Sequence, residues 1–151
     1  MYLRITIGMV LVFLVFSGIT FSADFDLDVD DDGETKALTD GLITLRYLFG
    51  YSDSSLLTDV AVPNAERSSS EEILSYLDIN RARLDVDGDG SAEALTDGIL
   101  ILRDLFGLSG DPLIQGSVSS NATRNIGREV TDYISSIKDS ERKDRIQSFI
   151  S

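Results

Sequence analysis

The chain contains one long segment twice, and each copy begins with an acidic loop. Residues 28–50, DVDDDGETKALTDGLITLRYLFG, align without a gap with residues 85–107, DVDGDGSAEALTDGILILRDLFG, after a shift of 57 residues. The same register continues through a set of polar and aromatic residues: Asn64, Arg67, Glu72 and Tyr76 in the first copy, and Asn121, Arg124, Glu129 and Tyr133 in the second. Self-similarity over this length predicts two whole structural units, because a repeat normally corresponds to one supersecondary unit.

Each acidic loop has three aspartates at alternate positions and a glycine at the sixth. These residues are Asp28, Asp30, Asp32 and Gly33 in the first loop, and Asp85, Asp87, Asp89 and Gly90 in the second. Calcium takes six to eight oxygen ligands, which alternate side chains of a tight loop can supply while the glycine permits a sharp turn. The seventh residue, Glu34 or Ser91, is expected to offer its backbone carbonyl. The pattern predicts two Ca²⁺ sites.

The closing carboxylate of each loop stands one residue later than in the common calcium loop. Position twelve, where that ligand normally lies, is Thr39 or Thr96, and the aspartate that follows is Asp40 or Asp97. Both copies share the shift. We therefore expect a loop enlarged by one residue and closed by Asp40 and Asp97, with Thr39 and Thr96 as the alternative ligands.

The two loops differ at position nine. Lys36 occupies it in the first loop and Glu93 in the second. A carboxylate there can assist a calcium ion directly or through water, whereas an ammonium group offers no acceptor. The sequence predicts tighter calcium binding in the second loop.

Periodic apolar residues predict that helices follow the loops. Leu38, Leu42, Leu45 and Phe49 form one stripe of an amphipathic helix that Gly50 would end, and the second copy repeats the pattern with Leu95, Ile99, Leu102, Phe106 and Gly107. We expect these stripes, including both phenylalanines, to face each other in a shared core. A second helix should open at a capping box formed by Ser69 and Glu72. Its counterpart should start near Val130 and run to about residue 150.

These elements predict an all-α fold. Two calcium-loop and helix units, repeat one over residues 26–83 and repeat two over residues 84–141, would form one domain over residues 24–151, packed with pseudo-twofold symmetry. Neither unit has enough apolar residues to bury its stripe alone.

Composition excludes several classes of function. The chain has no Cys and no His, so thiol nucleophiles, Ser-His-Asp triads and the usual zinc sites are missing. Asp and Glu number 26 against 13 Lys and Arg, a net charge of −13 that disfavours binding to nucleic acid or anionic membranes. We expect cations as partners and no enzymatic activity.

The first 23 residues form a separate segment. A charge-free apolar run follows Arg4 and gives way to smaller residues before Asp24, which is typical of a secretory signal peptide. The alternative is an uncleaved membrane anchor over residues 5–21. Both interpretations place residues 24–151 outside the cytoplasm, so we expect a secreted or extracytoplasmic protein, membrane-bound only if the segment is uncleaved.

Two acidic calcium loops, each leading directly into a helix that ends near Leu-Phe-Gly, resemble the half-EF-hands of dockerin type I domains. The resemblance covers about residues 26–50 and 84–107. It implies a calcium-stabilised module that binds a cohesin-like protein, generally within polysaccharide-degrading assemblies. The family's partner-contacting pair would fall on Leu38 with Ala37 or Thr39, and on Leu95 with Ala94 or Thr96. The alternative function is a calcium-dependent structural or buffering protein without a dedicated partner.

Overall fold

The computed structural model describes residues 25–138, which form helices and loops without a strand. The helical elements are η1 (Ala37–Gly41), α1 (Leu42–Leu48), η2 (Asp53–Ser55), α2 (Ser70–Ile79), η3 (Arg81–Leu84), η4 (Ala94–Gly98), α3 (Ile99–Leu105), α4 (Asp111–Ile114) and α5 (Gly127–Lys138). Within this described part, the expected helical fold is confirmed. The predicted signal peptide and the predicted helix end near residue 150 lie outside the described residues. Among residues 25–138, every helix is too short or too polar to span a bilayer.

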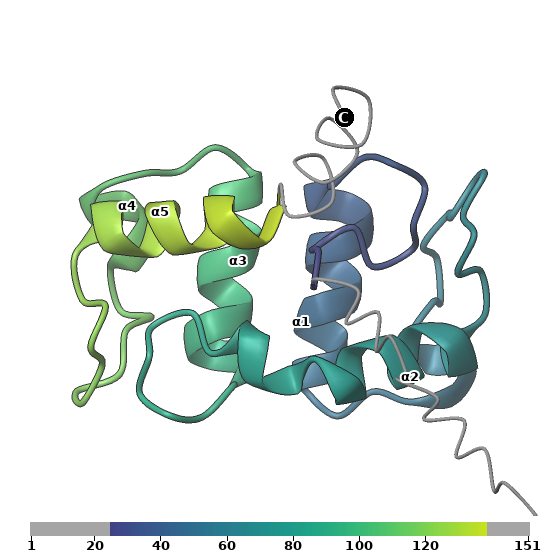
Figure 1. Ribbon diagram of the computed structural model, residues 1–151, viewed down its shortest axis with the longest axis horizontal. Coiled ribbons are helices and arrows are strands. Elements are labelled where there is room, and N and C mark those ends of the chain that lie inside the picture. The colour runs from purple at the N-terminus through teal and green to yellow at the C-terminus, as the bar shows by residue number, and fades with distance from the viewer. Residues whose placement is uncertain (1–24, 139–151) are drawn as a thin grey trace, which may run out of the picture.

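An antiparallel pair of helices, α1 and α3, lies at the centre of the fold (Figure 1). Gly41 ends η1 and faces the last turns of α3, where an added Cβ would lie 3.0 Å from Leu105. Gly98 ends η4 and faces α1 in the same way, with an added Cβ 2.7 Å from Leu45. Because a glycine from each half receives a leucine from the other, the two helices approach closely. The antiparallel arrangement also puts the two acidic loops at opposite ends of the pair.

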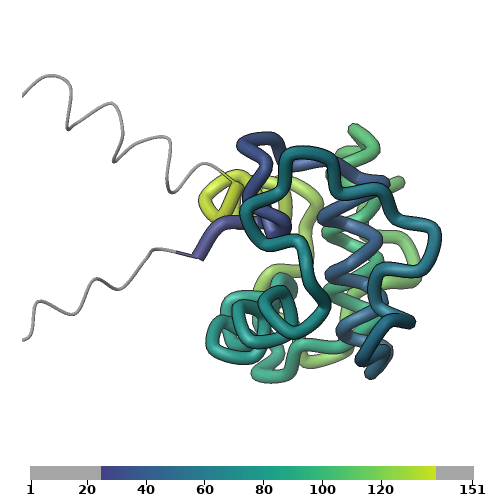
Figure 2. The backbone as a smooth tube through the Cα atoms, turned by 90° about the vertical axis from the view of Figure 1, so that its right-hand side faces the viewer, coloured from purple at the N-terminus to yellow at the C-terminus, as the bar shows by residue number. Residues whose placement is uncertain are grey.

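The remaining helices cover this central pair. α2 packs on α1, while α4 and α5 pack on α3. α2 runs across the axis of α1 in Figure 1 and is viewed close to end-on in Figure 2. The two ends of the described fold meet, since the amide of Leu27 donates to the carbonyl of Ile137 at 2.9 Å. Figure 2 shows these first and last segments side by side.

The predicted helix boundaries have clear local causes. Ser69 and Glu72 form the expected capping box at the start of α2, with side-chain and backbone bonds in both directions. Gly50 ends α1 with a φ of 84°, a conformation that favours glycine. Its amide bonds the carbonyl of Tyr47, and the next amide, of Tyr51, bonds that of Arg46, which is the Schellman pattern. Gly107 ends α3 with the same pair of bonds.

The expected core stripe of α1 and α3 is wrong at its ends. Leu38, Phe49, Leu95 and Phe106 are more than half exposed. The buried face of α1 instead carries Ile43, Thr44 and Tyr47, and that of α3 carries Leu100, Ile101 and Asp104. The sequence LITLRYLF is apolar on two sides of a helix, so its periodicity is compatible with either face. Only the middle of the predicted stripe, near Leu45 and Leu102, lies between the helices.

The core draws on both repeats. Ile43 and Leu77 from the first and Leu100 and Ile134 from the second belong to the same buried cluster. The valine in position two of each acidic loop also belongs to it, so each loop is fixed to the core by the residue between its first two aspartates.

Candidate metal centre

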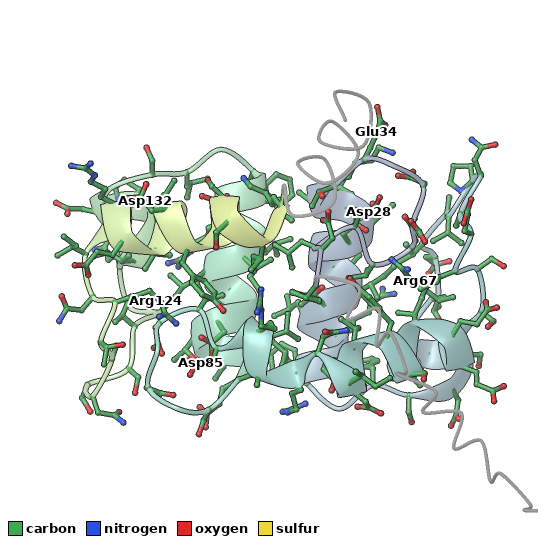
Figure 3. The ribbon with its side chains drawn as sticks, viewed as in Figure 1. Asp28, Glu34, Arg67, Asp85, Arg124 and Asp132 are labelled. Atoms are coloured by element: carbon green, nitrogen blue, oxygen red, sulfur yellow. The ribbon has the colours of Figure 1, made fainter. Side chains whose placement is uncertain are left out.

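Each acidic loop brings its three alternating aspartates together. One carboxylate oxygen from each of Asp28, Asp30 and Asp32 lies within 4.8 Å of the others, and the same holds for Asp85, Asp87 and Asp89. The side chains come from loop one (residues 28–40) and loop two (residues 85–97), at opposite ends of the central helix pair; Figure 3 labels the first aspartate of each loop. All the donors are hard oxygens, a set that suits a divalent cation such as calcium or magnesium.

Backbone amides hold the first aspartate of each loop in place. Asp28 accepts from Asp32 N at 3.1 Å through Oδ1 and from Gly33 N at 2.8 Å through Oδ2. Asp85 accepts from the amides of Asp89 and Gly90 at 3.1 and 3.0 Å. The sixth-position glycines have φ values of 90° and 99°, which a residue with a Cβ rarely adopts. The predicted sharp turn is therefore present in both loops.

A π-turn accommodates the extra residue of each loop. The amide of Gly41 bonds the carbonyl of Lys36, five residues earlier, at 3.1 Å, and Gly98 bonds Glu93 in the same way at 3.0 Å. The first turn of the helix is therefore widened by one residue in η1 and in η4. As a result, Asp40 and Asp97 point back toward the loops that precede them.

Asp40 and Asp97 fasten each loop to its helix from a buried position. Asp40 accepts from the amides of Val29 and Lys36 at 2.8 and 2.7 Å. Asp97 accepts from Val86 N at 2.6 Å, Asp87 N at 3.0 Å and Glu93 N at 2.8 Å, so it holds one more loop amide. Burial raises the pKa of Asp40.

These two aspartates are not members of the close oxygen clusters, which contain only the alternating aspartates. Thr39 and Thr96, the alternative closing residues, donate their hydroxyls to Asp40 and Asp97. Glu34 and Ser91 are exposed, and their amides bond the fifth-position aspartates. Figure 3 shows Glu34 projecting away from the body of the protein.

One oxygen of loop one lacks a partner that its burial would require. Asp30 is fully buried, yet its Oδ2 receives no hydrogen bond among the described residues. Burial, together with the nearby carboxylates of Asp40 and Asp32, raises the pKa of Asp30 to about 7. An unpaired buried acceptor among like charges is unfavourable unless a cation compensates it. The donor set and this open oxygen fit a metal ion.

The corresponding aspartate of loop two is satisfied by the protein. Asp87 Oδ2 accepts from the amide of Ser119 at 2.8 Å, and its Oδ1 accepts from Asp89 N at 3.1 Å. Burial raises the pKa of Asp87 as well. Ser119 lies in connector two (residues 108–126), the segment that joins α3 to α5 and folds over loop two.

Two arginines that the sequence pattern did not assign to the site donate hydrogen bonds to the backbone carbonyls of the loops. Arg67 donates from Nε to the carbonyl of Val29 at 2.9 Å and from Nη2 to the carbonyl of Asp28. Its guanidinium stacks on Tyr76, with Cζ 4.0 Å from the ring centroid. Arg124 makes the equivalent contacts to the carbonyls of Val86 and Asp85 and stacks on Tyr133. In Figure 3 each arginine lies in the same half as the loop it contacts.

The signal that could have identified these arginines was the 57-residue register. Arg67 and Arg124 occupy equivalent places in the repeat, as do Tyr76 and Tyr133. The bonds that the two arginines share go to backbone carbonyls, which every residue carries, so no side-chain pattern marks the partner. The arginines are positioning residues, since they touch the loop backbone and not the clustered carboxylate oxygens.

Among the residues that the structure describes, an ammonium group lies against the acidic cluster in loop one but not in loop two. Lys36 Nζ is 2.7 Å from Asp32 Oδ2 and 2.8 Å from Glu34 Oε2. The bond from Lys36 is the main cause of the lowered pKa of Asp32. Among residues 25–138, the clustered aspartates of loop two make no ion pair, so the two candidate sites differ in local charge.

Comparison of the chain with protein-family models, curated proteins and solved structures finds no match. The structure thus supports possible metal-binding loops in a helical protein, and the likeness to dockerins still rests on the loop residues themselves.

Proposed function

We propose that the protein is a calcium-binding interaction module of dockerin-like type, with one ion in each acidic loop. The observation that carries the proposal is the pair of three-carboxylate clusters, one of which contains the buried and unpartnered Asp30 Oδ2. All-oxygen clusters on a tight, glycine-turned loop suit calcium better than transition metals, which prefer nitrogen or sulfur ligands.

The alternating aspartates would hold the ions, assisted by the backbone carbonyls of Glu34 and Ser91. A bound cation supplies positive charge that offsets the mutual repulsion of the carboxylates. Asp40 and Asp97 already connect each loop to its helix through backbone amides. Whether they or Thr39 and Thr96 complete the ligand set, ion binding would stabilise the junction between loop and helix.

The proposal includes two duplicated units related by a pseudo-twofold axis. The reciprocal approach of Gly41 to α3 and of Gly98 to α1 supports it. So do the equivalent contacts of Arg67 and Arg124 with their loops. In this arrangement each ion stabilises one end of the central helix pair.

An exposed apolar surface supports a role in binding another protein. Leu38 is 69% exposed and its equivalent Leu95 is 66% exposed, although both begin helices that otherwise contribute to the core. Phe49 and Phe106, at the other ends of the same helices, are also exposed. Because α1 and α3 are antiparallel, each end of the pair presents one leucine and one phenylalanine. We propose a cohesin-like partner for this surface, outside the cytoplasm and in the setting of polysaccharide degradation.

Calorimetric titration of the metal-free full chain with CaCl₂ tests the ion-binding part. The expected result is two ions per chain, with weaker heats when MgCl₂ replaces CaCl₂, because magnesium needs stricter octahedral geometry. Absence of calcium-dependent heat, with an unchanged melting curve, would contradict the proposal.

The partner-binding part has its own test, which separates it from the alternative of a structural or buffering protein. A cohesin domain from the same genome should bind the calcium-loaded chain, and Leu38→Lys together with Leu95→Lys should abolish that binding. Arg128→Met, on an exposed ion pair of α5, is the control. If calcium binds but no cohesin domain does, the alternative function is favoured.

A further inference from the structure

We propose that Lys36 is a built-in counter-ion of loop one, which a divalent cation must displace before that loop fills. The inference rests on the proposed calcium binding and adds regulation to it. Loop two would bind its ion first, and loop one would respond only at higher calcium concentration.

The contacts of Lys36 place a positive charge directly on the candidate site. Its ammonium group lies 2.7 Å from Asp32 Oδ2 and 2.8 Å from Glu34 Oε2. Asp32 belongs to the close oxygen cluster, and its side chain is almost fully buried. Since Asp32 Oδ1 already accepts from Glu34 N, the lysine takes the other oxygen of this carboxylate.

Loop one nevertheless retains an open position for an ion. Asp30 Oδ2 is buried without a hydrogen bond among the described residues, so Lys36 does not compensate the whole cluster. The ammonium occupies the solvent side, where 42% of the lysine side chain is exposed. A divalent cation coordinated by the triad would lie close to this charge, and the two would repel each other.

Loop two contains no equivalent of this arrangement. Glu93 takes the place of Lys36 and is exposed. The fifth-position Asp89 accepts a hydrogen bond from the amide of Ser91 and makes no ion pair among the described residues. Arg124 donates to backbone carbonyls of the loop, whereas Arg67 in loop one also pairs with Asp31, at 2.9 Å. Loop one therefore carries three direct ion pairs to its acids, two through Lys36 and one through Arg67.

Total charge cannot account for a difference between the loops. Loop one has six acids and Lys36, and loop two has five acids and no base, so both have a formal charge of −5. Long-range attraction for a cation is then equal, and the local position of Lys36 decides. Filling of loop one would release the Lys36 and Glu34 side chains, which gives this end of the protein a calcium-dependent surface.

A site-resolved titration of the full chain with CaCl₂ tests the proposal. The amides of Gly33 and Gly90 are suitable reporters in ¹⁵N spectra, because each bonds the first aspartate of its own loop. In the unmodified protein, the amide resonance of Gly90 should shift at a lower calcium concentration than the amide resonance of Gly33. Lys36→Met should lower the midpoint at Gly33 by about tenfold, the order expected for removing one nearby surface charge, and leave that at Gly90 unchanged.

Two further variants make the test specific. Arg128→Met removes the same charge from a remote exposed ion pair on α5 and should change either midpoint by less than about twofold. Glu93→Lys places an ammonium in loop two and should raise the Gly90 midpoint. In the presence of chelator, Lys36→Met should also melt at a lower temperature than the unmodified protein, since the acids of loop one lose their counter-ion.

The outcomes separate this inference from the proposed function. If neither glycine amide responds to calcium in any variant, calcium binding itself is wrong and the inference fails with it. If both loops bind calcium but Lys36→Met leaves the Gly33 midpoint unchanged, or Gly33 shifts first in the unmodified protein, only the role of Lys36 is overturned.

Discussion

Loop one and loop two have nearly the same backbone but compensate their negative charge in different ways. In loop one the protein supplies cations, because Lys36 and Arg67 pair with Asp32 and Asp31. In loop two it supplies backbone amides, with Ser119 N on Asp87 and an additional amide on Asp97. A charged side chain can leave when an ion arrives, whereas a backbone amide orients a carboxylate without competing for the site. The comparison suggests one loop suited to sensing and one suited to structure.

The contacts at position four of the two loops differ in the same way. Position four of loop two is Gly88, and connector two lies so close that an added Cβ would be 2.2 Å from Thr123 Oγ1. Position four of loop one is Asp31, a non-glycine residue with a φ of 59°, whose side chain extends to Arg67. Loop two therefore depends on close backbone contact, and loop one depends on an ion pair at the same position.

Removal of calcium should have the largest effect. At a calcium concentration about 100 times the dissociation constant of each site, the two bound ions contribute about 5 kcal/mol to the free energy of unfolding. A chelator should therefore lower the melting temperature by roughly 20 °C. Amide exchange should increase more at Gly90 than at Gly33, because Lys36 still compensates loop one. Circular dichroism and hydrogen exchange provide the measurements. An equal increase at both glycines would remove the proposed difference between the loops.

Loss of the buried closing aspartates should come next. In the metal-free protein, Asp97→Ala should cost about 3 kcal/mol and Asp40→Ala about 2 kcal/mol, since Asp97 leaves one more buried amide without an acceptor. Urea unfolding with chelator present gives both values. Asp132→Ala, in an exposed pair on α5, is the control and should stay within about 0.5 kcal/mol. The reverse order would mean that amide satisfaction does not distinguish the loops.

Substitutions at position four should show a smaller asymmetry. Gly88→Ala should destabilise by about 2 kcal/mol, because its φ of 73° and the contact with Thr123 both oppose a side chain. Asp31→Gly should stay within about 1 kcal/mol, since relief of backbone strain offsets the lost pair with Arg67. Thermal unfolding compares the two variants. Equal losses would show that the close contact between Gly88 and connector two does not make loop two the less tolerant of the two loops.

Substitution of the two tyrosines that stack on these arginines should give the smallest difference in stability between the two halves. Tyr133→Phe removes one hydrogen bond, from Oη to the carbonyl of Arg83, and should cost about 1 kcal/mol. Tyr76→Phe removes two bonds with the backbone of Asp26 and should cost slightly more. Urea unfolding resolves this difference if each ring keeps its contact with its arginine. A larger loss for Tyr133→Phe than for Tyr76→Phe would contradict this assignment of the tyrosine hydrogen bonds.

Much of the site geometry could be predicted because it depends on local chemistry. Alternating aspartates before a glycine converge through the turn itself, as the three-carboxylate clusters show. The shared shift of Asp40 and Asp97 indicated an enlarged loop, although the π-turn that contains the extra residue was not predicted. Widening the first helical turn lets the aspartate face its loop without altering the triad spacing.

Other features depend on tertiary choices that the pattern leaves open. The helix sequence is apolar on two sides, so it does not show which side is buried. In the fold, α2 packs on α1, Ile43 and Tyr47 are buried in the core, and Leu38 and Phe49 are exposed. The contact between Lys36 and Asp32 depends on a side-chain conformation that spacing alone does not determine. Roles of this kind become visible only when the chain is folded.

The hydrogen bond between Leu27 and Ile137 has a mechanical consequence. It joins the first and last segments of the described fold, which lie side by side in Figure 2. A pulling force applied through both ends of residues 25–138 would act on this hydrogen bond before it acted on the helix pair at the centre. Under tension the fold should therefore open first at its joined ends.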